Sequence, residues 1–189
     1  RKVINKGVTE ADILRAADLI FGSGIPNLKL YFLIGLPTET DEDIDGIIGL
    51  AHKVHDEQLR HARPAGRIGR ITLSVNSFVP KPFTPFQWEP MEGLASLKGK
   101  QRKLEQAVKR IGNMHLIHDL PKWEHVQAFL ARGDRRTGAL LRLVHAKAGD
   151  WKAAARELAI DLERSVTRRR GFDEVLPWDF IDIGVRKEY

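Results

Sequence analysis

Residue types suited to binding a ligand follow directly on an apolar segment, in the run 35–39 (GLPTE). Gly35 would let a ligand approach the backbone closely, and Pro37 would stiffen the exit from the turn. The carboxylate of Glu39 could accept a hydrogen bond from a ligand hydroxyl or ammonium group, or it could only offset the dipole of a following helix. The run could therefore hold an adenine, a ribose or a phosphate, or it could simply join a strand to a helix.

A second candidate region begins at Asn76 and Ser77, which end the next β-favouring segment. Parallel α/β sheets place ligand contacts at such strand ends, although both side chains could instead satisfy loop amides. The segment 78–88 (FVPKPFTPFQW) follows, with three prolines and four aromatic residues. A stiff aromatic loop of this kind could close over a ligand, or it could pack against the bottom or flank of a barrel.

Histidine pairs raise the question of a metal site. His52, His55 and Asp56 have the i, i+3, i+4 spacing of helical metal ligands. Their helix face is otherwise polar, so we interpret the three as solvated. His115 and His118 would point to opposite faces of a strand, which argues against a shared metal there.

Two basic runs, residues 98–110 and 164–170, could contact a phosphate backbone. Neither run has interleaved aromatic residues, and we interpret both as solvated faces. No nucleophile elbow, Walker loop or glycosidase-like carboxylate pair is found in the sequence.

The composition limits the classes of protein that fit. The chain has 189 residues, 42% of them hydrophobic, and a formal charge of +6, which permits a nucleic-acid partner without requiring one. No run approaches the roughly 20 apolar residues of a membrane span, and no secretory leader opens the chain, so we expect a cytoplasmic protein without a membrane partner. There is no cysteine in the chain. The chain begins at Arg1 rather than at a methionine, so we expect either a processed protein or an excised piece of a longer one, and we favour the excised piece.

The elements that would position these residues alternate between helices and strands, which favours a parallel sheet. The strand at 28–34 is almost continuously apolar, so we expect both of its faces to be covered. From the patterns we expect a helix of about 14 residues after a capping Thr9, a strand at 28–34, a helix with the apolar stripe Ile44, Ile47, Ile48, Ala51 and Val54, a loop at 58–70, a strand at 71–79 and a helix at 91–111.

The remainder of the chain carries mainly helix signals, and we divide it from the first part as domains 1–112 and 113–189. A short strand is expected at 114–117, helices at 126–131, 137–148 and 150–162, and an apolar, extended tail at 176–182 that docks on some other surface.

Four segments together resemble a known family. They are Asn5-Lys6-Gly7, Gly35-Leu36-Pro37-Thr38-Glu39-Thr40, the stretch Phe78 to Trp88, and Leu176-Pro177-Trp178-Asp179 with Asp182 and Gly184-Val185. On these segments the chain resembles the second half of a radical S-adenosylmethionine (radical SAM) enzyme. It is most similar to the B12-binding-domain-associated Fe-S oxidoreductases of unassigned reaction, which are related to the tRNA methylthiotransferases.

The resemblance implies a six-stranded partial (β/α) TIM-like barrel. This chain would hold its last two or three parallel strands with their flanking helices, plus a mostly helical C-terminal extension. Such enzymes use a 4Fe-4S cluster to cleave S-adenosylmethionine into methionine and a 5′-deoxyadenosyl radical, which abstracts a substrate hydrogen. The cofactor-binding residues that the resemblance implies here are Ile34, Gly35, Leu36, Glu39, Asn76, Ser77, Phe78 and Val79.

The family binds its cluster through three cysteines spaced C-x3-C-x2-C, and this chain has none. We therefore expect no catalytic residue and no metal ligand in the chain, and no radical chemistry from it alone. S-adenosylmethionine and the 4Fe-4S cluster are expected in the full-length protein, with cobalamin as a candidate further cofactor and tRNA or a small molecule as substrate. The unpaired strand edge of a truncated barrel would favour dimerisation. The alternative is a non-catalytic RNA-binding or protein-interaction module.

Overall fold

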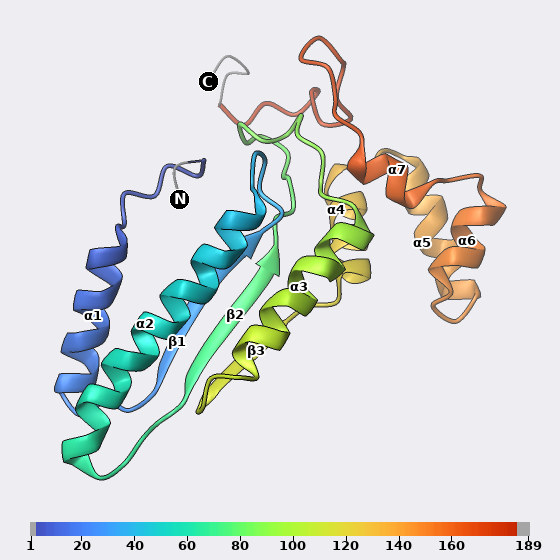
Figure 1. The fold of residues 1–189 in the computed structure, drawn as a ribbon. Helices are drawn as coiled ribbons and strands as arrows, with labels where there is room; N and C mark the ends of the chain where they lie inside the picture. The colour runs from blue at the N-terminus through green and yellow to red at the C-terminus, as the bar shows by residue number, and fades with distance from the viewer. Residues whose placement is uncertain (1–2, 185–189) are drawn as a thin grey trace. The chain divides into compact units, whose positions relative to one another are not determined.

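The computed structural model describes residues 3–184 and has a mixed α/β fold (Figure 1). In chain order its elements are α1 (Glu10–Gly22), β1 (Leu28–Ile34), α2 (Asp41–Ala65), β2 (Ile71–Ser77), α3 (Leu94–Val108), β3 (Met114–His118), α4 (Pro121–Arg132), α5 (Arg136–Ala146), α6 (Trp151–Glu157) and α7 (Leu162–Thr167).

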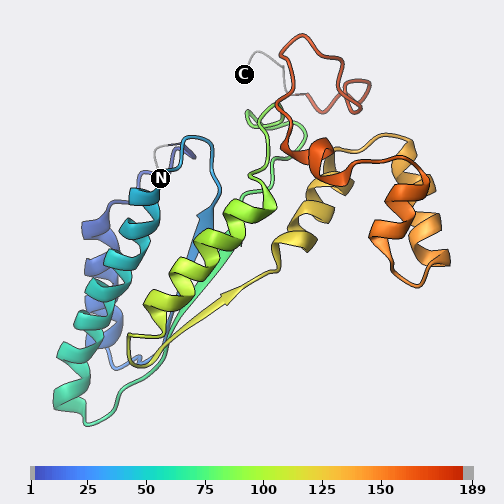
Figure 2. The ribbon, with the colours of Figure 1, turned by 45° about the vertical axis from the view of Figure 1, so that its right-hand side comes forward.

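The three strands form one parallel sheet in the order β1-β2-β3. Leu28 pairs with Ile71, which pairs in turn with Met114, so the strands start level with one another. The β1-α2-β2 and β2-α3-β3 crossovers run in the same direction, and α2 and α3 therefore lie on the same face of the sheet (Figure 2). A parallel sheet with flanking helices is what the sequence predicted, including the short third strand.

The two faces of the sheet differ in burial. On the helix-covered face Ile71, Leu73 and Val75 of β2 are fully buried, and they pack with the apolar stripes of α2 and α3. On the opposite face, which we call the open face, Tyr31 is 71% exposed and Leu33 41% exposed. The prediction that the 28–34 strand is covered on both faces is therefore wrong, since its burial alternates from residue to residue.

Helix α2 is longer than its apolar stripe and continues through part of the predicted loop at 58–70. Polar side chains hold this extension. The buried Gln58 donates to the carbonyl of Pro26 at 3.0 Å, and both Arg60 and His61 contact Asp18 on α1. The prediction failed because these inward contacts are made by polar residues, which a hydrophobic pattern does not reveal.

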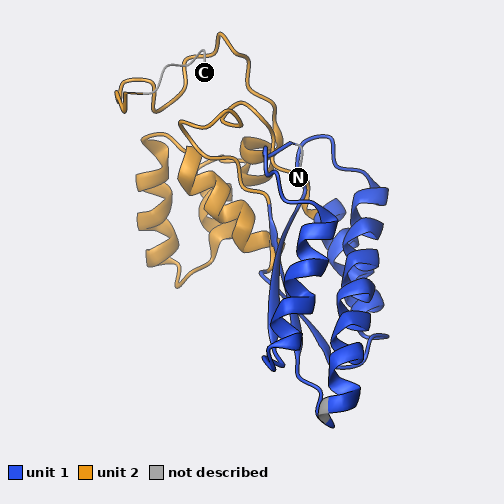
Figure 3. Ribbon diagram, turned by 90° about the vertical axis from the view of Figure 1, so that its left-hand side faces the viewer, with its two compact units in different colours: residues 1–77, 95–119 blue, residues 78–94, 120–189 orange. Residues whose placement is uncertain are grey.

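The chain divides into two compact units (Figure 3). Unit 1, residues 1–77 and 95–119, contains the sheet, and unit 2, residues 78–94 and 120–189, contains helices α4 to α7. The domain division predicted between residues 112 and 113 stays a prediction.

Unit 2 is mostly helical, as expected for the C-terminal region, but its helices differ in detail from the prediction. The helix expected at 150–162 is two helices, α6 and α7, because Ala159 has the left-handed φ of 51° and interrupts the hydrogen-bonding pattern. Asp161 then restarts the helix by accepting from the amide of Arg164 at 2.9 Å. Asp150 caps α6 in the same way, by accepting from the amide of Ala153 at 2.9 Å.

The apolar tail docks within unit 2, as predicted. Leu176 and Trp178 are 2% and 5% exposed and form a buried cluster with Trp88, against which Phe83 packs. Between residues 3 and 184, no helix is long and apolar enough to cross a membrane.

Candidate functional site

The predicted site in unit 1 lies where two paired strands end. Ile34 pairs with Ser77, and these last strand residues are 0% and 4% exposed. Gly35 follows with a left-handed φ of 76°, which a glycine adopts without strain. The carboxyl edge of the sheet thus brings five of the predicted residues, Ile34 to Leu36 with Asn76 and Ser77, onto two adjacent strand ends.

The turn after β1 contains one strained residue. Thr38 has a φ of 67°, and a β-branched residue rarely adopts this left-handed conformation. Such a conformation costs about 1–3 kcal/mol and persists only where its surroundings hold it. Thr40, two residues later, ends the turn. The Thr40 amide donates to the Asp43 carboxylate at 2.9 Å, at the start of α2.

Glu39 is the residue that holds the turn. Its Oε1 accepts from the Gly35 amide at 2.8 Å and from the Lys100 ammonium at 2.6 Å. The Glu39 and Lys100 side chains are only 6% and 12% exposed. Glu39 therefore fixes the position of Gly35 from inside unit 1, and Lys100 on α3 was missed because its basic run had been interpreted as a solvated face.

At the carboxyl ends of the strands, residues of the open face lie next to the Gly35 turn. Leu33 pairs with Asn76, and both side chains are exposed on this face. Tyr31 lies one step back along β1, with the Lys29 ammonium 4.8 Å from its ring centroid, and Ile117 of β3 is 45% exposed. These open-face residues were missed as candidates, although the alternation in 71–76 indicated that a second face exists.

A cavity in unit 1 is at the other end of the strands. It has a volume of about 650 Å³, and its lining includes Lys29, Arg70, Thr72 and His115. It lies at the amino ends of the strands, whereas α/β sheets bind ligands at the carboxyl ends. We therefore do not assign the predicted ligand to it.

The remaining predicted site residues, Phe78 and Val79, belong to unit 2. Phe78 is 8% exposed and packs edge-on against Phe86, with ring centroids 5.2 Å apart. Trp88 is buried in the tail cluster. The aromatic residues of this segment therefore pack within their own unit, and the segment 78–88 contacts the C-terminal tail rather than being a free stacking surface.

Potential metal ligands come together at one place among residues 3–184. The ligand atoms that cluster within 4.8 Å belong to Asp18, Glu57 and His61, a group that the sequence analysis did not consider. Arg60 donates to both carboxylates, at 2.5 Å to Asp18 and 2.6 Å to Glu57. The hydrogen bond with His61 lowers the pKa of Asp18. The Arg60 guanidinium group thus already binds the two carboxylates, and we interpret the cluster as a structural contact between α1 and α2.

The basic run 164–170 is only partly solvated. Arg168 forms two hydrogen bonds to Glu174, Arg169 contacts Glu89 at 2.5 Å, and Arg170 is 8% exposed. The interpretation of this run as a solvated face is therefore wrong for Arg170, which points into unit 2.

Among the residues on which the family resemblance rests, Val185 lies outside the described residues.

Sequence comparison finds one informative similarity. The chain is 37% identical over 141 residues to an uncharacterized protein of Methanocaldococcus jannaschii. The aligned region covers 75% of this chain and 29% of that protein, so the chain spans less than a third of the length of the curated relative it matches. No protein-family model matches the sequence, and no solved structure gives a significant match.

Proposed function

We propose that the chain is the C-terminal part of a radical SAM Fe-S oxidoreductase, whose full-length form cleaves S-adenosylmethionine and abstracts a substrate hydrogen. The observation that carries the proposal is the rigid Gly35 turn at the carboxyl edge of a parallel sheet, beside the exposed Asn76. This chain supplies no cysteine for a cluster and would be inactive alone.

The charges around the turn support S-adenosylmethionine over a nucleoside phosphate. Asp41, Glu42 and Asp43 make up the first turn of α2, directly after the Gly35 turn. These carboxylates would repel a phosphate, whereas S-adenosylmethionine carries a cationic sulfonium and an ammonium group. A neutral adenine could lie against the backbone of Ile34 to Leu36, where no charged side chain is needed.

The open face and the free edge of β1 support a partial barrel in the full-length protein. In a closed barrel one face of every strand points inward and helices cover the other face. The sheet has this asymmetry, with Tyr31, Leu33 and Ile117 exposed on the face that the helices leave uncovered. The curated relative is more than three times as long as the aligned region, which leaves room for further strands.

Isothermal titration calorimetry of S-adenosylmethionine tests the proposal, in two preparations. The 189-residue chain is expected to show no saturable binding, and the full-length, iron-reconstituted protein is expected to bind and to release 5′-deoxyadenosine on reduction. Comparable affinity in both preparations would contradict the half-site assignment. Absence of 5′-deoxyadenosine from a reconstituted protein with an intact cluster would contradict the radical SAM assignment.

A pair of glycine variants in the full-length protein tests the turn itself. Gly35→Ala adds a methyl group to a left-handed residue at the proposed site, whereas Gly24→Ala does so at a φ of 86° in the loop before β1, with no atom within 4 Å. Both variants carry similar backbone strain, so a tenfold or greater loss of S-adenosylmethionine affinity only in Gly35→Ala is expected. Equal losses would show that the turn acts through stability alone.

A further inference from the structure

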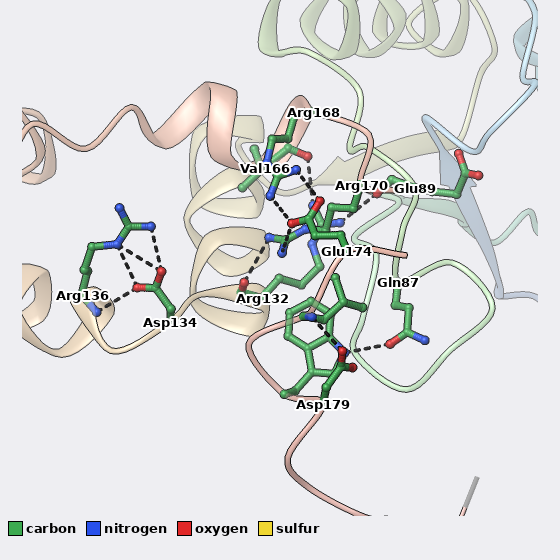
Figure 4. A network of polar contacts seen from close by, with 12 residues as sticks. Gln87, Glu89, Arg132, Asp134, Arg136, Val166, Arg168, Arg170, Glu174 and Asp179 are labelled. Carbon is green, nitrogen blue, oxygen red and sulfur yellow. Dashed lines mark hydrogen bonds and ion pairs between the residues drawn. The ribbon is translucent and has the colours of Figure 1, made fainter. Parts of the chain in front are cut away.

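Unit 2 contains two buried arginines, of which Arg132 has no ion pair among the described residues and Arg170 approaches a carboxylate, that of Glu174, only at 3.9 Å. Arg132 is 2% exposed, and its two terminal nitrogens donate to the carbonyls of Glu89 and Val166 at 2.8 and 2.9 Å. Arg170 is 8% exposed, donates to the Arg132 carbonyl at 3.2 Å, and lies over the Trp178 ring (Figure 4). The Nε of each arginine is buried and has no hydrogen-bond partner in the described part of the chain.

The nearby carboxylates are already engaged with other arginines. Glu174 accepts two hydrogen bonds from Arg168, at 2.8 and 2.5 Å, and its nearest approach to Arg170 is 3.9 Å (Figure 4). Asp134 similarly pairs with Arg136 at 2.7 Å. No ion pair to Arg132 is found among residues 3–184, so its positive charge is held in place by carbonyl groups alone.

This arrangement is unfavourable without a counter-ion. Burial and then the neighbouring Arg170 lower the pKa of Arg132 to about 10, and burial followed by Arg168 lowers the pKa of Arg170. A buried charge is costly unless it is paired, and a buried polar N–H left without an acceptor also costs free energy. An anion bound beside the two guanidinium groups would offset the cost of burying their charges.

A cavity of about 310 Å³ lies beside the two arginines. Its lining includes Arg132, Arg170, Arg136 and Arg168 together with the apolar side chains of Phe129 and Ile160. A cavity of this size is at the lower end of the range for small-molecule sites. Guanidinium groups suit tetrahedral oxyanions because their N–H groups form paired hydrogen bonds to two oxygens.

From these observations we propose that the cavity beside Arg132 and Arg170 in unit 2 binds the phosphate group of a phosphate monoester. The cationic groups would hold the phosphate, and Phe129 and Ile160 would contact the organic group attached to it. Asp134, Asp161 and Glu174 also line the cavity, so a single phosphate fits its charge better than a polyphosphate chain. All these residues belong to unit 2, and the inference does not depend on the proposed function.

The first test measures binding of phenyl phosphate and inorganic phosphate to the 189-residue chain, by calorimetry and thermal unfolding at constant ionic strength. We expect saturable one-to-one binding, a higher unfolding temperature than in matched chloride, and tighter binding of phenyl phosphate. A short oligonucleotide with and without a 5′-phosphate distinguishes an RNA end from a small metabolite as the source of the phosphate. If neither phenyl phosphate nor the 5′-phosphorylated oligonucleotide shows saturable binding, the proposal is overturned.

Variants then locate the site. Arg132→Lys keeps the charge but loses the paired donors, and we expect at least tenfold weaker binding if the variant folds. Arg136→Gln tests the site even if Arg132→Lys does not fold. Arg136 lines the cavity, and because its side chain is 78% exposed, its loss should weaken binding without preventing folding. Arg135→Gln, at the adjacent exposed residue outside the cavity lining, is the matched control. Equal affinity in the Arg136 and Arg135 variants would contradict the assigned position.

Discussion

Glu39 and Lys100 form the ion pair on which the Gly35 turn depends. Both side chains are at least 88% buried, and Glu39 also accepts from the Gly35 amide. A buried pair contributes little relative to an apolar pair of the same shape, but removal of one partner leaves a charge uncompensated. The structural role of Glu39 therefore makes the turn sensitive to a residue on α3 that is 61 positions away in the sequence.

We expect Lys100→Met to destabilise the chain by about 3–5 kcal/mol because it leaves the Glu39 carboxylate buried without its cation. Lys103→Met is the matched control, since Lys103 pairs with Asp45 at the same 2.6 Å but the two side chains are 40% and 59% exposed. Its cost should be below about 1 kcal/mol. Urea unfolding followed by circular dichroism measures both values, and similar losses in the two variants would refute the role assigned to burial.

The Glu174 carboxylate gives unit 2 a sensitivity to acid. Hydrogen bonds from Arg168 lower the pKa of Glu174 below its ordinary value of 4.5. The folded state therefore favours the ionised form, and this contribution to stability is present above pH 4.5 and is lost as the pH falls through the lower, folded-state pKa. We expect Glu174→Gln to be less stable than the parent at pH 7 and to lose less stability on acidification below pH 4.5. Parallel unfolding-temperature curves for the two proteins from pH 7 to pH 3 would contradict this linkage.

At the scale of elements, apolar periodicity located every strand and most helices but not their limits. The α2 extension was missed because Gln58, Arg60 and His61 make its inward contacts, and the α6–α7 break was missed because Ala159 gives no sign of a left-handed backbone. The site was predictable as far as the strand ends, where glycine, proline and threonine mark the turn. The contact of Lys100 with Glu39 could not be predicted, because pairing between residues 61 positions apart leaves no local sequence pattern.

The C-terminal tail is an element that docks through a buried tryptophan. Trp178 is 5% exposed, packs with Trp88 and Leu176, and donates from its indole to Gln87 at 2.7 Å. We expect Trp178→Ala to release the tail, with a loss of about 3–5 kcal/mol in unit 2, because a large buried aromatic residue is removed. Phe180→Ala is the control, because that side chain is 86% exposed. Limited proteolysis should cleave the tail faster only in the Trp178 variant, and equal cleavage of both variants would show that the docking is not stabilising.

At the scale of the whole molecule, the sheet ends in an exposed edge strand. β1 is the first strand in the sheet order, and its side away from β2 has no strand partner between residues 3 and 184. Unpaired strand edges readily pair with another chain, and the adjacent open face exposes Tyr31 and Leu33. Under the partial-barrel proposal, another strand would cover this edge in the full-length protein, and we expect association through the edge in the 189-residue chain only.

We therefore expect the 189-residue chain to form concentration-dependent dimers in size-exclusion chromatography with light scattering. Tyr31→Lys should shift the chain toward monomer, because a lysine on an edge strand opposes pairing and removes an aromatic group that is 71% exposed. Leu19→Lys is the matched control, because Leu19 is 66% exposed and belongs to helix α1 rather than to the sheet. A monomeric parent chain at all concentrations, or equal effects of the two substitutions, would mean that β1 is not an edge awaiting another strand and would weaken the partial-barrel proposal. A dimer that Tyr31→Lys alone dissociates would instead support the proposal that a further strand pairs with β1 in the full-length protein.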